Sequence, residues 1–400
     1  MILIVSAVFP PEPVVSANIS SDLALELLKK WRVKVITPTP TRPMGYSFKD
    51  SNENKKFEQI VVKSYTCPES KLPGRIRESY SFGKHSARFI KANKINIQCI
   101  YVNAWPLLAQ YLIVKAAKKS SIPVVLHVQD IYPESLLGKL RFFKKNVFRL
   151  LLPIDKYVIR NATRVVTISP AMKLYLCKTR AIDDQKVDIV YNWQNEKALS
   201  NVTQLLKPGQ KKDYSNFTFM YLGSLSRTAA IQVLISAFAI SEIADSRLVI
   251  AGNGSEKDYL AALANEYKGL NIEFWDAPMA MVPEIQEKAD VLLLSLAKGA
   301  ARFALPSKLA AYMLSQKPII ACVEELSDTA NVILKSKCGW VVPPEDPVAL
   351  AKAMNNAKIL SCEELIAYGK NGHSYAHTIF SQKNNLNRLV NIIEETILPL

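Results

Sequence analysis

The chain has 400 residues, which is too long for one ordinary hydrophobic core and suits two domains. Apolar residues make up 49% and charged residues 22%, a balance that excludes a disordered or fibrous protein. The net charge of +16 is concentrated in residues 1–200, which carry 32 Lys and Arg against 15 Asp and Glu. This half is therefore expected to meet an anionic membrane surface, an anionic substrate or nucleic acid.

The six cysteines form no C-x-x-C pair, and no histidine stands beside them at ligand spacing. They are predicted to be reduced core thiols, and a structural zinc site is not expected. No apolar run reaches the length of a membrane span. The apolar start, Met1–Val8, lacks a basic flank and precedes Pro10 and Pro11, which is typical of a buried strand rather than a signal peptide. A cytoplasmic protein is predicted.

Short β-branched runs alternate with helical patterns throughout the first half. The predicted strands are Ile2–Val8, Val33–Thr37, Gln59–Tyr65, Gln98–Val102, Val124–Val128 and Arg164–Ile168. Helical periodicity fills most of the intervals, as in Ile19–Lys30 and Leu107–Lys118. Strands separated by helices indicate βαβ units in a parallel sheet that is covered on both faces.

The second half repeats this rhythm. Its predicted strands are Phe217–Leu222, Arg247–Ala251, Asn271–Trp275, Val291–Leu294, Ile319–Cys322 and Gly339–Val342, and its predicted helices are Ala230–Ser241, Glu256–Tyr267, Lys308–Leu314 and Pro347–Ala357. Residues 194–213 lack apolar periodicity and contain a Pro-Gly pair, which indicates a linker. The fold class is α/β, with two doubly wound, Rossmann-like domains at 1–193 and 214–378. Their ligand sites are expected at the carboxyl ends of the strands, facing each other across a cleft.

The segment Pro306-Ser307-Lys308 has the residue types that bind a diphosphate. A proline near a helix start is pre-organised, and the first turn offers unpaired N–H groups and the positive end of the helix dipole. Ser307 adds a hydroxyl and Lys308 a charge, with Lys298 and Arg302 just before them. The alternative is that Ser307 is an ordinary helix cap and Lys308 a solvated side chain.

His127 ends an apolar strand, which is where ligand sites of α/β proteins gather. It is predicted to contact the reacting sugar; the alternative is a histidine satisfied by backbone carbonyls. Asp130 either binds a substrate hydroxyl or caps the helix that begins near Glu134.

Several segments, taken in their order along the chain, resemble those of the family 4 glycosyltransferases. The resemblance is closest to the branch that builds bacterial capsule, O-antigen and exopolysaccharide. In the first half they are Phe9–Pro13, His127–Pro133, Ile168–Met172 and Asn192-Trp193; in the second half they are Tyr221–Leu225, Ala251–Gly254, Ala289–Leu294, Leu305–Leu309 and Lys317–Ala321. The resemblance implies the GT-B fold, with an acceptor-binding first domain and a donor-binding second domain. It also implies that residues 379–400, with a helix at Gln382–Thr396, return to the first domain.

The resemblance also implies roles for single residues. The acceptor-side loop holds Pro11, Glu12, Ser16 and Asn18, and the catalytic residues are His127, Asp130 and Lys308. The donor diphosphate is bound by Gly223, Ser224, Arg227, Arg302, Ser307 and Lys308, and the nucleotide by Gly252, Gly254, Asp276 and Pro278. Transfer with retention, through displacement on one face of the sugar, is expected. No metal and no cofactor are expected, and a UDP-sugar is the preferred donor.

The sequence departs from the family pattern at the donor site. Two Glu separated by seven residues are replaced by Phe303 and Ala311, and the basic residues that usually follow the Gly223 loop are replaced by Ser224 and Ala229. Three alternatives therefore stay open: a nucleotide-sugar 2-epimerase of the same fold, a non-catalytic partner that kept the fold, and a nucleic-acid binder. No helix-turn-helix, RNA-binding aromatic motif or zinc finger supports the last of these.

The segment Lys139–Arg160 is predicted to be an amphipathic helix. Arg141, Lys144, Lys145, Phe148 and Arg149 fall on one face, and Leu140, Phe143, Val147, Leu150, Leu151 and Ile154 on the other. Lys84, Arg88 and Lys91 form a second basic stripe. The alternative is a core helix with a solvated basic face. Basic amphipathic helices can lie on anionic membranes, so peripheral association with the inner face of the cytoplasmic membrane, where a lipid-linked acceptor would also lie, is predicted.

Overall fold

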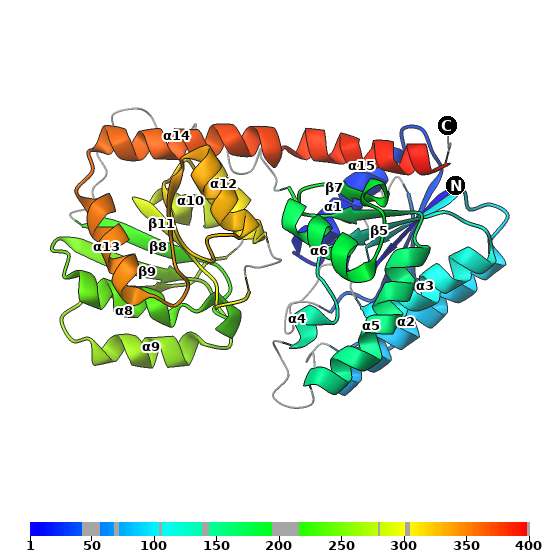
Figure 1. The fold of residues 1–400 in the computed structure, drawn as a ribbon, viewed down its shortest axis with the longest axis horizontal. Helices are drawn as coiled ribbons and strands as arrows, with labels where there is room; N and C mark the ends of the chain where they lie inside the picture. Colours follow the sequence, from blue (N-terminus) through cyan, green and yellow to red (C-terminus); the bar gives the residue numbers. More distant parts are fainter. Residues whose placement is uncertain are drawn as a thin grey trace. The chain divides into compact units, whose positions relative to one another are not determined.

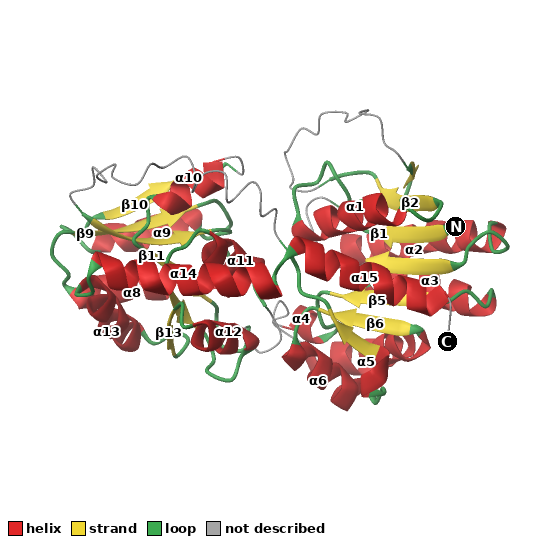
Figure 2. Cartoon of the chain, turned by 90° about the horizontal axis from the view of Figure 1, so that it is seen from above, coloured by secondary structure: helices red, strands yellow, loops and turns green. Residues whose placement is uncertain are grey.

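The computed structural model describes residues 1–41, 57–67, 72–103, 106–137, 144–193, 216–278, 281–300 and 305–397. They form two compact units. Unit 1 comprises Met1–Asn192 and Lys383–Leu400, and unit 2 comprises Trp193–Gln382. Each unit holds one sheet of parallel strands flanked by helices (Figures 1 and 2). The predicted linker at 194–213 lies outside the described residues.

The sheet of unit 1 has the strand order β3-β2-β1-β4-β5-β6-β7, with every neighbouring pair parallel. The strands are β1 (Ile2–Ser6), β2 (Val33–Pro38), β3 (Glu58–Val62), β4 (Cys99–Asn103), β5 (Val124–Val128), β6 (Arg164–Thr167) and β7 (Val187–Ile189). The helices are α1 (Val15–Leu27), α2 (Leu72–Ala92), α3 (Leu107–Lys119), α4 (Glu134–Leu137), α5 (Lys144–Asn161), α6 (Pro170–Arg180) and the short η1 (Asp184–Lys186). Helices α2, α3 and α5 lie side by side (Figure 1). All residues of β1, β4 and β5 are buried, as expected for apolar strands covered on both faces.

The six predicted strands of the first half are present, with small changes at their ends. Strand β1 ends at Ser6 rather than Val8; the Ser6 hydroxyl donates a hydrogen bond to the Val8 carbonyl oxygen (2.6 Å) as the chain leaves the sheet. Strand β7 was not predicted, because a three-residue strand is too short to show a hydrophobic period.

The sheet of unit 2 has the order β10-β9-β8-β11-β12-β13, again all parallel. The strands are β8 (Phe217–Leu222), β9 (Ser246–Ala251), β10 (Ile272–Trp275), β11 (Val291–Ser295), β12 (Ile319–Cys322) and β13 (Gly339–Val342). The helices are η2 (Arg227–Ala229), α8 (Gln232–Ser241), α9 (Lys257–Glu266), α10 (Val282–Glu287), α11 (Ser307–Leu314), α12 (Asp328–Ser336), α13 (Pro347–Lys358) and α14 (Cys362–Ile379). Both sheets thus have the doubly wound topology that the alternation of strands and helices predicts.

The last helix, α15 (Gln382–Ile397), packs on unit 1. The Asn385 side-chain oxygen accepts a hydrogen bond from the Tyr191 backbone N–H (2.9 Å), and Glu394 accepts one from the Trp31 indole (3.1 Å). Among the described residues, no helix combines the length and apolarity needed to cross a membrane.

Candidate active site

The strand order of each sheet reverses direction between two neighbouring strands. The two strands are β1 and β4 in unit 1, and β8 and β11 in unit 2. We call the place between them the switch point of the sheet. In α/β sheets the connections from two such strands run to opposite faces, and ligands bind at the carboxyl ends of the strands beside this point. Most of the predicted site residues follow these strands or their neighbours.

In unit 2 the structure brings Lys308 against the turn that follows β8. The Lys308 ammonium, at the start of α11, donates a hydrogen bond to the Tyr221 hydroxyl (2.6 Å) and lies 4.3 Å from the centre of its ring. The Tyr221 hydroxyl in turn donates to the Ser224 carbonyl oxygen (2.8 Å). A Cβ atom on Gly223 would approach the ammonium to 3.0 Å, and the φ of +153° at this position also disfavours a side chain. Two segments 87 residues apart in sequence are thereby joined at the switch point.

The Lys308 ammonium is partly desolvated. Burial lowers its pKa from 10.5 to about 8. The group therefore stays protonated at neutral pH, while the cost of its desolvation favours an anionic partner. Helix α11 begins after Pro306, which occupies the N-cap position and gives no side-chain cap within the described part of the chain. The ammonium therefore belongs to the first turn of α11, at the positive end of the helix dipole.

Gly252 and Gly254 shape this turn. A Cβ atom on Gly252 would lie 2.0 Å from the Gly223 carbonyl oxygen, and one on Gly254 would lie 2.2 Å from the Leu225 carbonyl oxygen. The Leu225 N–H donates to the Asn253 carbonyl oxygen (2.9 Å), which fixes the two loops together. Both glycines are therefore required by close backbone packing, whatever else they bind; their predicted nucleotide contact stays a prediction.

Two carboxylates hold the loop that follows β11. The backbone N–H of Lys298 donates to Glu345 (3.1 Å), and that of Gly299 donates to Glu324. The second carboxylate oxygen of Glu324 is buried without a hydrogen-bond partner among the described residues. At the two family positions that usually carry Glu, Ala311 lies half-buried in α11 and Phe303 lies outside the described residues.

The other predicted donor residues are more exposed. The side chains of Ser224, Arg227 and Ser307 are exposed beside the Gly223 turn and the start of α11. Asp276 and Pro278 follow the edge strand β10 and are also exposed, and Asp276 pairs with Lys257 (2.9 Å). Arg302 lies outside the described residues.

In unit 1 His127 is buried near the end of β5, and its Nδ1 lies 2.7 Å from the Tyr101 hydroxyl of β4. Burial lowers the pKa of His127 to about 3, so the imidazole is neutral at physiological pH. The Tyr101 hydroxyl has no other hydrogen-bond partner among the described residues, so we assign its proton to the bond with Nδ1. This places the imidazole proton on Nε2, which is buried and has no partner within the described parts of the chain.

A polar cluster joins the switch point of unit 1 to helix α1. The Ser16 hydroxyl donates to the Gln129 side-chain oxygen (2.5 Å), and Asn103 of β4 donates to the Ser16 carbonyl oxygen (3.0 Å) and the Ser20 hydroxyl (2.8 Å). The Gln129 side-chain nitrogen is buried and has no partner among the residues that the structure describes. His127 and Gln129 therefore both present unused N–H donors from the same end of β5.

The remaining predicted acceptor-side residues serve the loop itself or lie on the surface. The Glu12 carboxylate is 4% exposed and accepts hydrogen bonds from the backbone N–H groups of Phe9 (3.3 Å) and Thr41 (2.9 Å). Glu12 therefore anchors the loop. Pro11 is half-buried, whereas Asn18 and Asp130 are exposed.

Sequence reasoning missed Tyr101 and Gln129. Tyr101 stands in an otherwise apolar strand, where an aromatic residue is usually core, and only its register beside β5 reveals the contact. Gln129 could have been found, since it follows His127 by two residues and so falls on the same side of an extended chain.

The family comparisons agree in the two halves of the chain. Residues 18–195 match the family model described as Glycosyltransferase Family 4, and residues 216–357 match the one described as Glycosyl transferases group 1. The chain is 27% identical over 240 residues to the probable glycosyltransferase WbjE of Pseudomonas aeruginosa. That alignment spans 58% of this chain and 58% of the curated relative. These matches support a glycosyltransferase.

Solved structures resemble the chain over almost its whole length. Anabaena Alr3699/HepE in complex with UDP has a TM-score of 0.73 at 16% identity, covering 98% of this chain and 99% of that one, and the same protein has been solved with UDP-glucose. WaaG, a glycosyltransferase involved in lipopolysaccharide biosynthesis, has a TM-score of 0.68 at 15% identity over 98% of this chain and 99% of its own. At these identities the likeness shows the fold, which is the GT-B architecture.

Proposed function

We propose that the chain is a retaining, metal-independent glycosyltransferase that moves a sugar from a nucleoside diphosphate sugar, with UDP-sugars as the first choice, to a lipid-linked or saccharide acceptor of a bacterial surface polysaccharide. The observation that carries the proposal is the Lys308 ammonium held at the Gly223 turn, beside the start of α11. A fixed cation in the first turn of a helix, beside a switch point, suits a diphosphate. The UDP and UDP-glucose complexes of the Anabaena protein support the choice of donor.

The chemistry follows from where charge develops. As the bond between the sugar and the β-phosphate breaks, negative charge grows on the leaving oxygen. Lys308 uses one of its three N–H donors on Tyr221, so the others can reach phosphate oxygens. The acceptor hydroxyl forms its new bond on the face that the diphosphate leaves, and its proton passes to the leaving phosphate oxygen. This displacement retains the configuration of the sugar and needs no carboxylate nucleophile, in keeping with Ala311 at one of the family's Glu positions.

His127 acts in this scheme as a hydrogen-bond donor. A neutral imidazole with its proton on Nε2 cannot accept a proton there, but it can bind a sugar hydroxyl oxygen. Gln129 offers a second donor from the same end of β5. Exposed Asp130 can accept a hydrogen bond from a substrate hydroxyl.

Calorimetry with UDP, GDP, ADP and CDP tests the donor, with and without EDTA, because the proposal requires affinity without a metal. The preferred nucleotide is then offered as a panel of its sugars, and release of the nucleoside diphosphate is followed. Slow hydrolysis without acceptor, with the α-anomer released from an α-linked donor, supports a retaining transferase. Binding without turnover would point to a non-catalytic partner, and C2 epimerisation of the sugar would point to an epimerase.

We also propose that the protein lies peripherally on an anionic membrane through the segment 139–160. Within helix α5, which covers Lys144–Asn161, the side chains of Lys145 and Arg149 are exposed. Leu150, predicted for the apolar face, is instead 71% exposed beside Arg149. An exposed leucine among basic side chains suits insertion into a lipid headgroup layer. Arg141 lies outside the described residues.

Sedimentation with vesicles tests this surface. Wild type should sediment with vesicles containing phosphatidylglycerol at low salt. Replacing Arg141, Lys144, Lys145 and Arg149 with Glu should release it, because each basic side chain near the surface contributes about 1 kcal/mol. The matched control replaces four exposed lysines of unit 2 with Glu: Lys268, Lys335, Lys352 and Lys370. If both variants lose sedimentation with the vesicles equally, the effect is one of net charge alone. If wild type does not sediment with the vesicles, the proposal is wrong.

A further inference from the structure

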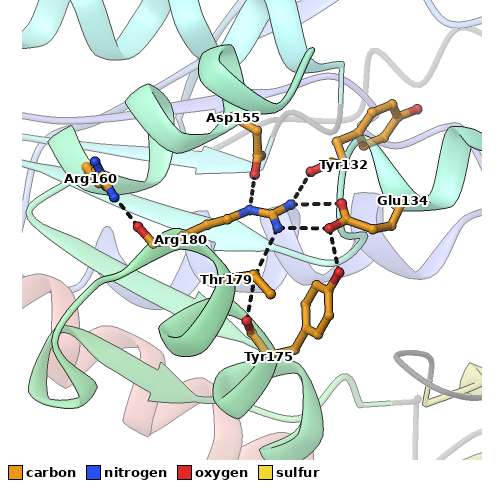
Figure 3. Close-up of polar contacts among 7 residues, drawn as sticks. All are labelled: Tyr132, Glu134, Asp155, Arg160, Tyr175, Thr179 and Arg180. Atoms are coloured by element: carbon orange, nitrogen blue, oxygen red, sulfur yellow. Dashed lines mark hydrogen bonds and ion pairs between the residues drawn. The ribbon is translucent and has the colours of Figure 1, made fainter. Parts of the chain in front are cut away.

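Arg180, the last residue of α6, is fully buried, and its guanidinium is surrounded by partners from other elements of unit 1 (Figure 3). Its Nε donates to Asp155 of α5 (2.6 Å), and its two terminal nitrogens donate to the two carboxylate oxygens of Glu134 of α4 (2.8 Å each). One of them also donates to the Tyr132 carbonyl oxygen (2.6 Å). We call Arg180, Glu134, Asp155 and Tyr132 the Arg180 hub.

Further contacts tighten the hub. The Tyr175 hydroxyl donates to Glu134 (2.7 Å), and the Arg160 Nε donates to the Arg180 carbonyl oxygen (2.8 Å), so α5 and α6 are joined twice (Figure 3). One guanidinium thus faces two carboxylates. Burial raises the pKa of Asp155 to about 6; Arg180 opposes this rise and Glu134 adds to it.

The hub lies at one end of the loop between β5 and α4. The other end is held at Gln129, which accepts a hydrogen bond from Ser16 (2.5 Å). Between these two anchors the chain exposes Asp130. The loop therefore leaves the strand that carries His127, passes the switch point of unit 1 and enters the hub at Tyr132.

We propose that Arg180 is a positioning residue, which holds the β5–α4 loop so that Asp130 keeps the orientation needed to bind a substrate hydroxyl. The inference rests on the proposed function. Burying a charge cluster is a weak source of stability, and apolar replacements of similar volume are often as stable. What a guanidinium adds here is its rigid fork, which reaches both oxygens of Glu134 and the loop carbonyl at once.

The experiment compares Arg180→Lys with wild type by two readouts. Hydrogen exchange of residues 129–137 is expected to accelerate, because a single ammonium cannot replace all the contacts of the fork. Hydrolysis of UDP-glucose is expected to fall roughly tenfold in kcat, with KM and UDP affinity nearly unchanged, since the diphosphate site lies in unit 2. A tenfold loss corresponds to about 1.4 kcal/mol.

A double-mutant cycle separates positioning from general damage. If Arg180 acts through Asp130, then Arg180→Lys should have little further effect on turnover in an Asp130→Ala background. If the fold-losses of turnover in the two single variants multiply in the double variant, the two residues act independently and the proposal is wrong. The matched control is Arg164→Met, which removes a half-buried pair with Asp188 (2.7 Å) at the opposite end of β6 and should change neither readout.

Two outcomes keep the inference distinct from the proposed function. Unchanged exchange in the loop overturns the positioning role even if the protein is an active transferase. Faster exchange, with a wild type that turns over no nucleotide sugar, means that the hub orders the loop but that the proposed function is wrong. Should Arg180→Lys not fold, the neutral combination Arg180→Met, Glu134→Gln and Asp155→Asn removes the fork without leaving a buried charge, and it is measured in the same way.

Discussion

The two units repeat one arrangement of side chains, but the basic group is neutral in unit 1 and charged in unit 2. In each, a tyrosine on a strand at the switch point bonds a basic side chain: Tyr101 holds His127 in unit 1, and Tyr221 holds Lys308 in unit 2. The histidine is fully desolvated and neutral, with a pKa of about 3. The lysine is half-buried and, with a pKa of about 8, remains charged at neutral pH.

This difference fits the ligands that we propose for the two units. A neutral N–H donor binds sugar hydroxyls without attracting a phosphate, whereas an ammonium kept partly out of water binds phosphate strongly. The proposed function therefore assigns His127 to a sugar hydroxyl and Lys308 to the diphosphate. The excess of Lys and Arg in residues 1–200 therefore does not indicate that the diphosphate binds to unit 1, because the proposed phosphate ligand, Lys308, belongs to unit 2.

The largest effect is expected for Lys308→Ala. A charge-assisted hydrogen bond contributes about 1.5–3 kcal/mol, and more to a transition state that gains charge. UDP affinity should fall by at least about tenfold and turnover by more. Lys308→Arg should recover part of the loss, because the guanidinium is larger and differently shaped.

Calorimetry with UDP measures the affinity directly. Lys335→Ala, an exposed lysine elsewhere in unit 2, is the control for loss of one charge. Wild-type affinity and turnover in Lys308→Ala would mean that Pro306–Lys308 is only a helix start and that the donor binds elsewhere.

The next effect is expected for His127→Ala. Turnover should fall by about tenfold, because the one hydrogen bond that Nε2 donates to the transferred sugar is worth up to about 1.5 kcal/mol. UDP affinity should stay close to that of wild type, since the diphosphate is assigned to unit 2. His85→Ala, a half-buried histidine of α2, is the control. Equal activity in wild type and His127→Ala would return His127 to a structural role.

Much of the fold could be predicted because parallel strands that are covered on both faces have continuous apolar sequences. The place of Lys308 in the first turn of a helix could be predicted as well, since proline favours that turn; its role toward a diphosphate stays a prediction. Its contact with Tyr221 could not, because it joins residues 87 positions apart.

The contacts of other polar side chains could not be predicted, because burial of a polar group is decided by distant partners. Glu12 was assigned to the acceptor-side loop, but the sequence does not reveal that its carboxylate accepts from the N–H groups of Phe9 and Thr41. Arg180 ends a helix, where a basic residue normally interacts with the dipole and solvent. Its burial depends on Glu134 and Asp155, two carboxylates from other helices that the sequence does not place beside it.

The charge state of Lys308 gives a smaller, pH-dependent effect. Because its folded-state pKa of about 8 lies below the unfolded value of 10.5, the ammonium costs stability at pH 7, and this cost is relieved as the pH rises from about 8 to 10.5. A bound diphosphate should raise the pKa again. Binding of UDP at pH 9 should therefore take up as much as about one proton, whereas binding at pH 7 should take up almost none.

Calorimetry in two buffers of different ionisation enthalpy measures this uptake. Lys308→Met should bind UDP weakly and without uptake at either pH. The absence of uptake by wild type at pH 9 would show that Lys308 does not meet the phosphates.

The smallest effect is expected for Tyr101→Phe, which tests the tautomer on which the role of His127 depends. In wild type the Tyr101 hydroxyl donates to Nδ1, so the proton sits on Nε2 and faces the substrate. Without this bond the neutral ring loses about 0.5–1.5 kcal/mol of its preference for the tautomer with the proton on Nε2. Turnover should therefore fall by only about two- to tenfold. Long-range nitrogen–proton NMR of labelled histidine distinguishes the two tautomers: wild type should show the proton on Nε2, and Tyr101→Phe a mixture. A wild-type proton on Nδ1 would reverse the polarity of the Tyr101 bond and leave Nε2 as an acceptor. His127 would then accept from a substrate hydroxyl rather than donate to one, and the contrast between the two switch points would rest on Lys308 alone.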